Sequence, residues 1–365
     1  MRVGPTKQRP PRRAQTTAEA IAQARPAYEA DLKAGLDHFF HPRQNQCPWC
    51  QSHRLQPHLH TKDLLQHKPG DFHLDRCQDC GHIFQNPRLN PEGLAFYYRD
   101  FYDGLGEKNT ANLFAGRTTT YRRRAQALTP HNPRPTTWLD VGTGHGHFCA
   151  TAQTIHPHTA FDGLDFTDGA ELAEKAGRVR HGHRGNFPDI APTITGHYDV
   201  VSMFHYLEHS EQPWLELQAA HQALRPGGHL LIEVPDAASR YSRLLGRRWL
   251  PWLQPQHLHF IPAANLRERL TTLGFTVLTE HHLEAHDRVD LLAATWFTLD
   301  ALAPREEAPW LAGRPGKLKR AARAAVVIAG IPALLAATVL DRVMPRFLIR
   351  RLELSNAYRV IARRD

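Results

Sequence analysis

The amino-acid sequence predicts an α/β protein, in which a parallel sheet with crossover helices lies between a small cysteine-rich segment and a helical C-terminal region. Short β-rich runs alternate with helical stretches between residues 136 and 285, which is the pattern of a parallel sheet. Two Cys-x-x-Cys pairs precede this region, and a long apolar stretch follows it. With 365 residues, the chain is long enough for two or three domains.

Changes in composition divide the chain into five segments. The expected segments are a basic tail and helix at 1–40, the cysteine-rich segment at 41–90, a helical linker or cap at 91–135, a ligand-binding core at 136–285, and a helical insertion with a final strand at 286–365. Within the core, strands are expected at 137–141, 160–165, 177–182, 198–204, 229–234 and 275–279. The final strand is expected in "NAYRVIARRD".

The chain carries a formal net charge of +9, and the charge is distributed unevenly. Basic residues crowd two places, one near the N-terminus (Arg2, Lys7, Arg9, Arg12 and Arg13) and one before the apolar stretch (Lys317, Lys319, Arg320 and Arg323). Such clusters meet RNA, anionic lipid or phosphorylated substrates, and they are equally compatible with solvated surface. The first 40 residues lack the apolar part of a secretory signal, so we expect a cytoplasmic protein whose five cysteines form no disulfide framework.

A glycine-rich loop follows the first core strand in "TWLDVGTGHGHF" and predicts a ligand site between a strand and a helix. Its glycines are spaced G-x-G-x-G, whereas a dinucleotide fingerprint requires a glycine at the position of His147. The Gly-Lys-Ser/Thr ending of a triphosphate loop is missing. Asp140 would repel a pyrophosphate and attract an ammonium group. The loop therefore favours a sulfonium amino-acid nucleoside over NAD or ATP.

Four further segments follow in order: "AFDGLDFTD", "GNFPDI", "HYDVVSMFHYLEH" and "LRPGGHLLIEVPD". Together with the glycine loop they resemble class I S-adenosylmethionine-dependent methyltransferases over about residues 120–285. The resemblance implies a Rossmann-like sheet of seven strands. The residues expected to hold the cofactor are Asp140, Gly142 and Gly144 at its methionine end, Asp165 at its ribose, Asn186 and Phe187 at its adenine, and Gly146, Phe166, Phe204 and His205 elsewhere along it.

The two cysteine pairs, "CPWC" and "CQDC", predict a structural metal site. Each pair holds a metal from a tight turn, and the two pairs complete a tetrahedral thiolate site with no position open for water. We therefore expect structural Zn²⁺ in a zinc ribbon at 41–90, held by Cys47, Cys50, Cys77 and Cys80. A ribbon followed by "CGHIFQNPRLNPEGLAFYYRDFY" and this core is similar to bacterial methyltransferases of sugar, surface-polysaccharide and natural-product pathways.

Methyl transfer is an in-line displacement, so the protein mainly positions the acceptor and removes its proton. Histidine suits this step near neutral pH, and His257 is the first candidate for the base. Sugar C-methyltransferases have a Glu-His pair where this sequence has Gln256 and His257, and the missing glutamate favours a hydroxyl or amine acceptor over a carbon. The other residues expected around the acceptor are His209, Tyr97, Tyr98 and Tyr102.

The segment "HYLEH" matches the H-x-x-E-H pattern of certain zinc proteases. That pattern needs its ligands on one helix face, whereas here it crosses the end of an expected strand, so we exclude a protease. A divalent metal near Glu208 and His209 is an open alternative, although methyltransferases that bind one there usually have glutamate at the position of His205.

These observations predict methyl transfer from S-adenosylmethionine to a small molecule, with the oxygen of a sugar, polysaccharide precursor or secondary metabolite as the expected acceptor. The alternative is an RNA methyltransferase, in which the ribbon and the basic tail grip phosphates. A non-catalytic platform conflicts with the presence of the loop glycines, Asp140 and Asp165. Finally, the stretch Ala324–Leu340 contains no charged residue, and it either packs as a helical hairpin or contacts the surface of an anionic membrane.

Overall fold

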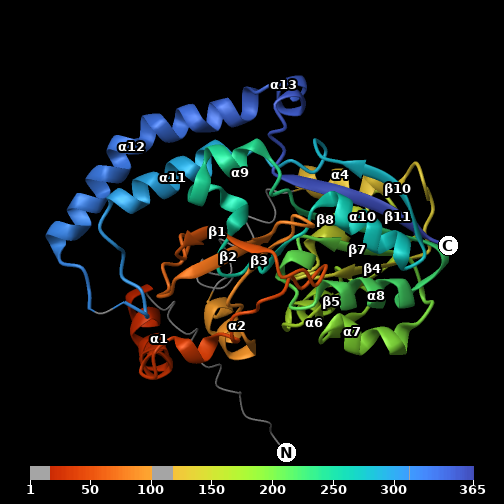
Figure 1. Ribbon diagram of the computed structural model, residues 1–365, viewed down its shortest axis with the longest axis horizontal. Coiled ribbons are helices and arrows are strands. Elements are labelled where there is room, and N and C mark those ends of the chain that lie inside the picture. The colour runs from red at the N-terminus through yellow and green to blue at the C-terminus, as the bar shows by residue number, and fades with distance from the viewer. Residues whose placement is uncertain (1–16, 101–117, 312) are drawn as a thin grey trace, which may run out of the picture.

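The computed structural model describes residues 17–100, 118–311 and 313–365 (Figure 1). Its largest element is a seven-stranded sheet in the order β10-β11-β8-β7-β4-β5-β6. The strands are β4 (Thr137–Val141), β5 (Ala160–Asp165), β6 (Gly182–Arg184), β7 (Tyr198–Phe204), β8 (Leu224–Pro235), β10 (Phe275–His281) and β11 (Ala357–Arg364). Strands β4 to β8 are parallel, and β11 is antiparallel to both β8 and β10. The predicted seven-stranded α/β fold is confirmed.

Each face of this sheet has its own hydrophobic core, because successive side chains of a strand point to opposite faces. Trp138 and Val200 belong to one core, whereas the adjacent Leu139 and Val201 belong to the other. The first core packs on α4 (Thr118–Leu128), α5 (His147–Ala152) and α6 (Gly169–Lys175), and the second on α7 (Phe187–Ile190), α8 (Pro213–Ala223) and α10 (Ala263–Thr272). Burial on both faces explains why these strands are continuous apolar runs in the sequence.

The third core strand begins later than the sequence suggested. Residues 176–180 form turns and bends, and β6 spans only Gly182–Arg184, instead of the expected 177–182. Val179 is buried in the core and anchors this connection. A side chain at Gly182 would place its Cβ 2.1 Å from the carbonyl oxygen of Ala170, so the glycine is what lets the strand approach α6.

The cysteine-rich segment forms a second, four-stranded antiparallel sheet in the order β1-β2-β3-β9. Its strands are β1 (Leu55–Thr61), β2 (Phe72–Cys77), β3 (Ile83–Gln85) and β9 (His259–Phe260). The fourth strand comes from the chain that follows β8, far from the first three in the sequence. In addition, the amide of Asn265 in α10 donates a hydrogen bond to the carbonyl of Cys80 (3.0 Å). The small sheet is thus joined to the large one by shared chain and by direct contact.

Short helices surround the two sheets. Before the cysteine pairs lie α1 (Thr17–Leu32) and a 3-10 turn (Asp37–Phe39), and after them lies α2 (Pro91–Tyr98). Further 3-10 turns span Ala191–Ile194, Leu207–His209, Gly246–Arg248 and Leu250–Trp252, and α9 spans Arg240–Leu244. The N-terminal basic cluster and Tyr102 lie outside the described residues.

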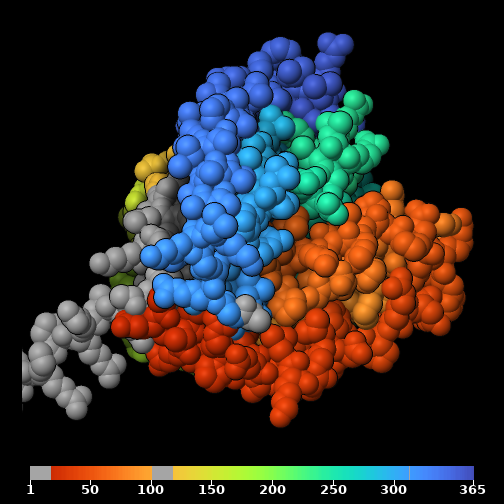
Figure 2. Space-filling view, turned by 90° about the vertical axis from the view of Figure 1, so that its left-hand side faces the viewer, coloured from red at the N-terminus to blue at the C-terminus, as the bar shows by residue number. Residues whose placement is uncertain are grey.

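A helical hairpin forms the C-terminal insertion and precedes the last strand, as predicted. It consists of α11 (Asp290–Leu302) and α12 (Lys317–Val343), and α13 (Arg346–Arg351) connects it to β11. Figure 2 shows the hairpin, in blue, against the red and orange N-terminal segments. Within the described ranges, α12 is the one helix whose length and apolar composition would allow it to cross a membrane.

Candidate functional site

The glycine loop lies at the point where the strand order of the large sheet reverses. From β4 the chain continues to β5 and β6 on one side, whereas β7 and β8 lie on the other. In open α/β sheets, ligands bind at the carboxyl ends of the strands at this point. Gly142, Gly144 and Gly146 have φ values of 76°, 50° and 73°, a left-handed conformation that glycine adopts at little cost. A Cβ at Gly144 would meet nothing within 4 Å, so this part of the loop is open.

Asp165 connects the loop to the end of β5. One carboxylate oxygen accepts a hydrogen bond from the backbone N–H of Gly144 (2.9 Å), and the other accepts from the backbone and hydroxyl of Thr167 (2.9 and 2.7 Å). The next residue, Phe166, has 55% of its surface exposed. Together these residues offer a fixed carboxylate beside an accessible aromatic ring.

Asp140 lies beneath the loop, and its carboxylate is hydrogen-bonded to a side chain of the neighbouring strand β7. The hydroxyl of Ser202 donates to its carboxylate (2.6 Å), and the indole N–H of Trp138 in turn donates to Ser202 (2.9 Å). Burial raises the pKa of Asp140 to about 6. The side chain therefore supports the loop from below, and Cys149, which is buried against it, is a core residue.

The expected adenine-binding pair is separated by the fold. Asn186 is exposed, and its amide donates to the carboxylate of Asp189 (3.0 Å). Phe187 is fully buried in the core beneath α7, so its ring does not reach the surface beside Asn186. Phe187 is the first residue of α7, and its side chain packs into the core instead of lining the proposed ligand site.

His205 lies at the end of β7 with a left-handed φ of 53° and faces two glutamates. Its Nδ1 is 3.1 Å from Glu208, and its Nε2 is 3.5 Å from Glu233. Burial lowers the pKa of His205, but the hydrogen bonds to the two carboxylates outweigh burial and raise it to about 9. His205 is thus an imidazolium at neutral pH.

Glu233 is the centre of a buried charge network that the sequence did not reveal. Arg124 and Arg359 each donate two hydrogen bonds to its carboxylate, with the shortest at 2.6 and 2.7 Å. The Arg124 guanidinium also lies 4.8 Å from the ring of Phe204, which packs on Phe148. The only sequence signal for Arg124 was its position on the same helix face as the apolar Tyr121 and Leu128.

The two histidines expected near the acceptor lie together, beside Glu208. The rings of His209 and His257 have centroids 4.5 Å apart, and Nε2 of His257 is 4.0 Å from Glu208 Oε1. Nδ1 of His257 donates to the carbonyl of Pro251 (2.7 Å), which leaves a lone pair on Nε2. Burial lowers the pKa of His257 to about 3, so this ring is neutral. Glu208 Oε2 is buried and, among the described residues, has no hydrogen-bond partner.

Two tyrosines of α2 approach this group, in different ways. The hydroxyl of Tyr98 lies 2.6 Å from Nδ1 of His209, and its ring meets Phe166 edge-on at 6.0 Å. Tyr97 is buried, and its hydroxyl donates to the carbonyl of Pro69 (2.6 Å), so it is part of the core. Tyr98 therefore connects the glycine-loop side of the site to the histidines.

The four cysteines of the ribbon converge on one point. The Sγ atoms of Cys47 and Cys80 are 3.6 Å apart, those of Cys50 and Cys77 are 3.5 Å apart, and all four lie within 4.8 Å of one another. Zinc–sulfur bonds of about 2.3 Å in a tetrahedron require sulfur atoms about 3.8 Å apart. The arrangement fits a closed four-thiolate zinc site.

Comparison with known proteins agrees with this geometry. Residues 114–280 match the family model described as a methyltransferase domain. The chain contains an S-adenosylmethionine-dependent methyltransferase domain. The matched residues include the glycine loop and Asp165, Arg124 and Glu233 of the buried charge network, and the histidines His209 and His257.

Solved structures are also similar to this methyltransferase, at low sequence identity. A SAM-dependent methyltransferase from Archaeoglobus fulgidus is 16% identical, with 73% of this chain and 100% of that chain covered and a TM-score of 0.45. An O-methyltransferase family protein from Burkholderia thailandensis is 19% identical, with 47% and 56% covered and a TM-score of 0.37. A search of curated protein sequences found no match.

Proposed function

We propose that this methyltransferase transfers the methyl group of S-adenosylmethionine to an oxygen of a small molecule, such as a sugar, a polysaccharide precursor or a secondary metabolite. The observation that carries this proposal is the connection from Phe166 through Tyr98 to His209 and His257. Through these contacts, the exposed edge proposed for the cofactor and the buried histidine proposed as the proton acceptor are neighbours. The missing glutamate at Gln256 favours a hydroxyl over a carbon acid as the acceptor.

In this proposal the glycine loop and Asp165 would hold the cofactor. Gly142 and Gly144 let the backbone approach its methionine end, and Asp165 has lone pairs left for the ribose hydroxyls after its bonds to Gly144 and Thr167. The exposed ring of Phe166 suits the adenine, and Asn186 suits its polar edge. The cofactor supplies an electrophilic methyl group that departs from a sulfonium centre.

His257 is proposed as the general base. Its Nε2 would take the proton of the acceptor hydroxyl as that oxygen accepts the methyl group. The nearby Glu208 carboxylate stabilises the imidazolium that results. The lowered pKa of His257 keeps the ring in its proton-accepting form before the reaction.

A divalent ion is the alternative for this group of side chains. The donor atoms of Glu208, His209 and His257 lie within 4.8 Å of one another, which is close enough for one ion. If such an ion were required, brief chelation would abolish activity and added Mn²⁺ would restore it and give a bound-ion spectrum. The proton-acceptor role predicts that activity survives this treatment.

Zinc at the four cysteines is proposed to be structural. A site with four protein ligands leaves no position for substrate. Zinc binding of this kind would stabilise the ribbon by about 10 kcal/mol. The purified protein should therefore contain one tightly bound zinc per chain, measured by elemental analysis.

The test of the function uses methyl-tritiated S-adenosylmethionine with a lysate of the source cells. Label is counted separately in RNA, protein, aqueous small molecules and organic extract. We expect label in a small-molecule or lipid fraction, lost in His257→Ala but kept in the matched control His158→Ala, whose side chain is exposed before the amino end of β5. Label in RNA that falls steeply with salt would replace our substrate class with nucleic acid.

A further inference from the structure

The outward face of α12 is apolar over most of its length. Ile328, Ile331, Leu335, Val339 and Val343 are between 45% and 64% exposed and follow one another at helical spacing along one side. Leu318 and Phe347 extend this surface at its two ends. No charged residue lies between Ala324 and Leu340. Contiguous exposed apolar surface of this kind marks an interaction site.

The inner face of α12 is fixed against α11, so the apolar side cannot rotate inward. Gly330 lies so close to Leu299 that a Cβ there would be 2.3 Å from the leucine side chain. Near the other end, the buried carboxylate of Asp341 accepts hydrogen bonds from the backbone N–H groups of Leu291 and Leu292 (3.2 and 2.9 Å). These N–H groups belong to the first turn of α11, where a negative charge is favourable.

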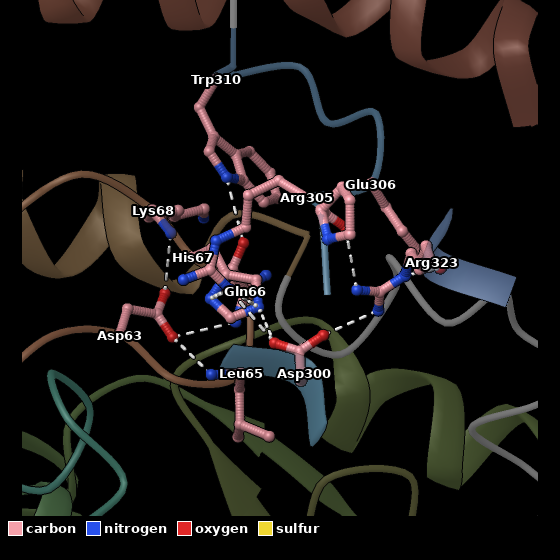
Figure 3. A network of polar contacts seen from close by, with 11 residues as sticks. Asp63, Leu65, Gln66, His67, Lys68, Asp300, Arg305, Glu306, Trp310 and Arg323 are labelled. Atoms are coloured by element: carbon pink, nitrogen blue, oxygen red, sulfur yellow. Dashed lines mark hydrogen bonds and ion pairs between the residues drawn. The ribbon is translucent and has the colours of Figure 1, made fainter. Parts of the chain in front are cut away.

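The hairpin is also anchored, at the end where α11 connects to α12, to the loop between β1 and β2 (Figure 3). The carboxylate of Asp300 lies 2.6 Å from His67, 3.1 Å from Arg305 and 2.7 Å from Arg323. Burial raises the pKa of Asp300, but the bonds from His67 and Arg323 outweigh it and lower the pKa to about 2. The indole of Trp310 adds a hydrogen bond to the carbonyl of Gln66 (3.0 Å). The hairpin is thus held at both ends, and its apolar side faces outward.

Basic residues flank the apolar face at both ends. They are Lys317, Lys319 and Arg320 at the start of α12, and Arg342, Arg346, Arg350 and Arg351 at its end and in α13. All seven are exposed, and within the described residues none of them is in an ion pair. The only acidic residue between 317 and 352 is the buried Asp341. A second copy of this surface would bring equal charges together, whereas an anionic bilayer complements both the charge and the apolar face.

We propose that α12 and α13 dock this methyltransferase on the surface of an anionic membrane, with α12 lying in the plane of the headgroups. The helix is about 40 Å long, enough to span a bilayer, but spanning would break its contacts with Leu299, Leu291 and Leu292. A helix that keeps one side on protein and buries the other among lipid headgroups satisfies both faces. This inference concerns location and goes beyond the proposed reaction, which does not depend on it.

The experiment is co-sedimentation of the full-length protein with vesicles. We expect binding to mixed vesicles of phosphatidylglycerol and phosphatidylcholine, at least tenfold weaker binding to pure phosphatidylcholine, and weakening at high salt. The double variant Ile331→Glu/Leu335→Glu should reduce binding at least tenfold. Leu172→Glu, an exposed leucine on α6, is the matched control and should bind as the unmodified protein does. Both side chains changed in the double variant are exposed, so thermal unfolding should be unaltered.

A second variant tests the charge component separately. Lys319→Glu/Arg346→Glu should weaken binding to anionic vesicles and leave cofactor binding, measured by calorimetry, unchanged. Equal binding of all variants, or binding that ignores lipid charge, would overturn the proposal. So would a dimer that sediments without lipid and dissociates in Ile331→Glu/Leu335→Glu, because the face would then belong to a second copy. Failure to bind S-adenosylmethionine would contradict the proposed function and leave the vesicle result intact.

Discussion

The two sheets of this methyltransferase are stabilised in different ways. The seven-stranded sheet is covered on both faces by continuous apolar cores, so its stability is distributed over many side chains. The four-stranded sheet has a first strand, β1, that is largely solvent-exposed, and four cysteines converge beside it. Its other strands are mostly buried, and Leu74, Ile83 and Phe260 pack with Trp249 and Trp252 in a smaller core. We expect a metal held by the four cysteines to add a second contribution to the stability of this sheet. The larger sheet is therefore stabilised by many apolar contacts, whereas part of the stability of the smaller sheet is expected to depend on metal binding.

Removal of zinc should have the largest effect and should be confined to the smaller sheet. Cys77→Ser, or prolonged chelation, removes about 10 kcal/mol of binding energy from the ribbon. Hydrogen exchange should then accelerate in residues 47–85 and in β9, while β4 and β7 keep their protection. Cys149→Ser, a change at the fifth cysteine, should retain the zinc. Equal loss of protection in both sheets would show that the two do not differ as described.

Within the larger sheet, Glu233→Gln should cause the greatest loss for a single residue. The change leaves Arg124, Arg359 and His205 with reduced compensation in a buried site, which typically costs about 3–5 kcal/mol. Urea denaturation measures this difference. Glu353→Gln, at a 70% exposed carboxylate, is the control and should change stability by less than about 0.5 kcal/mol. If Glu233→Gln lost no more stability than the control, the charge network would not contribute to the stability of the larger sheet.

Stability should also fall at alkaline pH because of His205. Its folded pKa, about 9, is above the usual 6.5, so its contribution is complete below pH 6.5 and is lost as the pH rises through about 9. The melting temperature should therefore decrease between pH 7 and pH 10, and the decrease should be smaller in His205→Gln. An unchanged slope in that variant would assign the alkaline effect to other groups.

The smallest expected effect tests the contact between the sheets. Asn265→Ala removes the hydrogen bond from α10 to the carbonyl of Cys80, which should cost about 1 kcal/mol. Exchange at the second cysteine pair should accelerate slightly, with zinc content unchanged. An Asn265→Asp variant keeps the shape but places a carboxylate against the carbonyl oxygen of Cys80, so it should cost more than Asn265→Ala. An equal or smaller cost would contradict this contact.

Much of the fold follows from local sequence patterns. The apolar runs placed β4, β5 and β7 at their observed bounds, because strands buried on both faces need continuous apolar residues. The glycines of the loop were recognisable because left-handed backbone favours that residue. The cysteine spacing predicted four thiols that do converge.

Other features depend on contacts between distant segments, and no local pattern encodes them. β9 is two residues long and pairs with β3, which no periodicity could predict. Arg124, Glu233 and Arg359 come from three separate elements, and each alone looks like an ordinary surface charge. Phe187 looked like a ligand contact from its position after a strand, but tertiary packing buries it. The glycine loop of the candidate site was therefore predictable from the sequence, whereas the buried charge network beside it was not.

The strand exchange between the two sheets also bears on how the chain is made. β3 ends at Gln85 and β9 begins at His259, so roughly 170 residues must be synthesised before the smaller sheet is complete. At 5–20 residues per second, its first three strands wait on the order of 10–40 s for the fourth. During that interval a bound zinc would be the main constraint on the nascent ribbon. Metal supply at the ribosome would then influence the yield of folded enzyme before any catalysis begins.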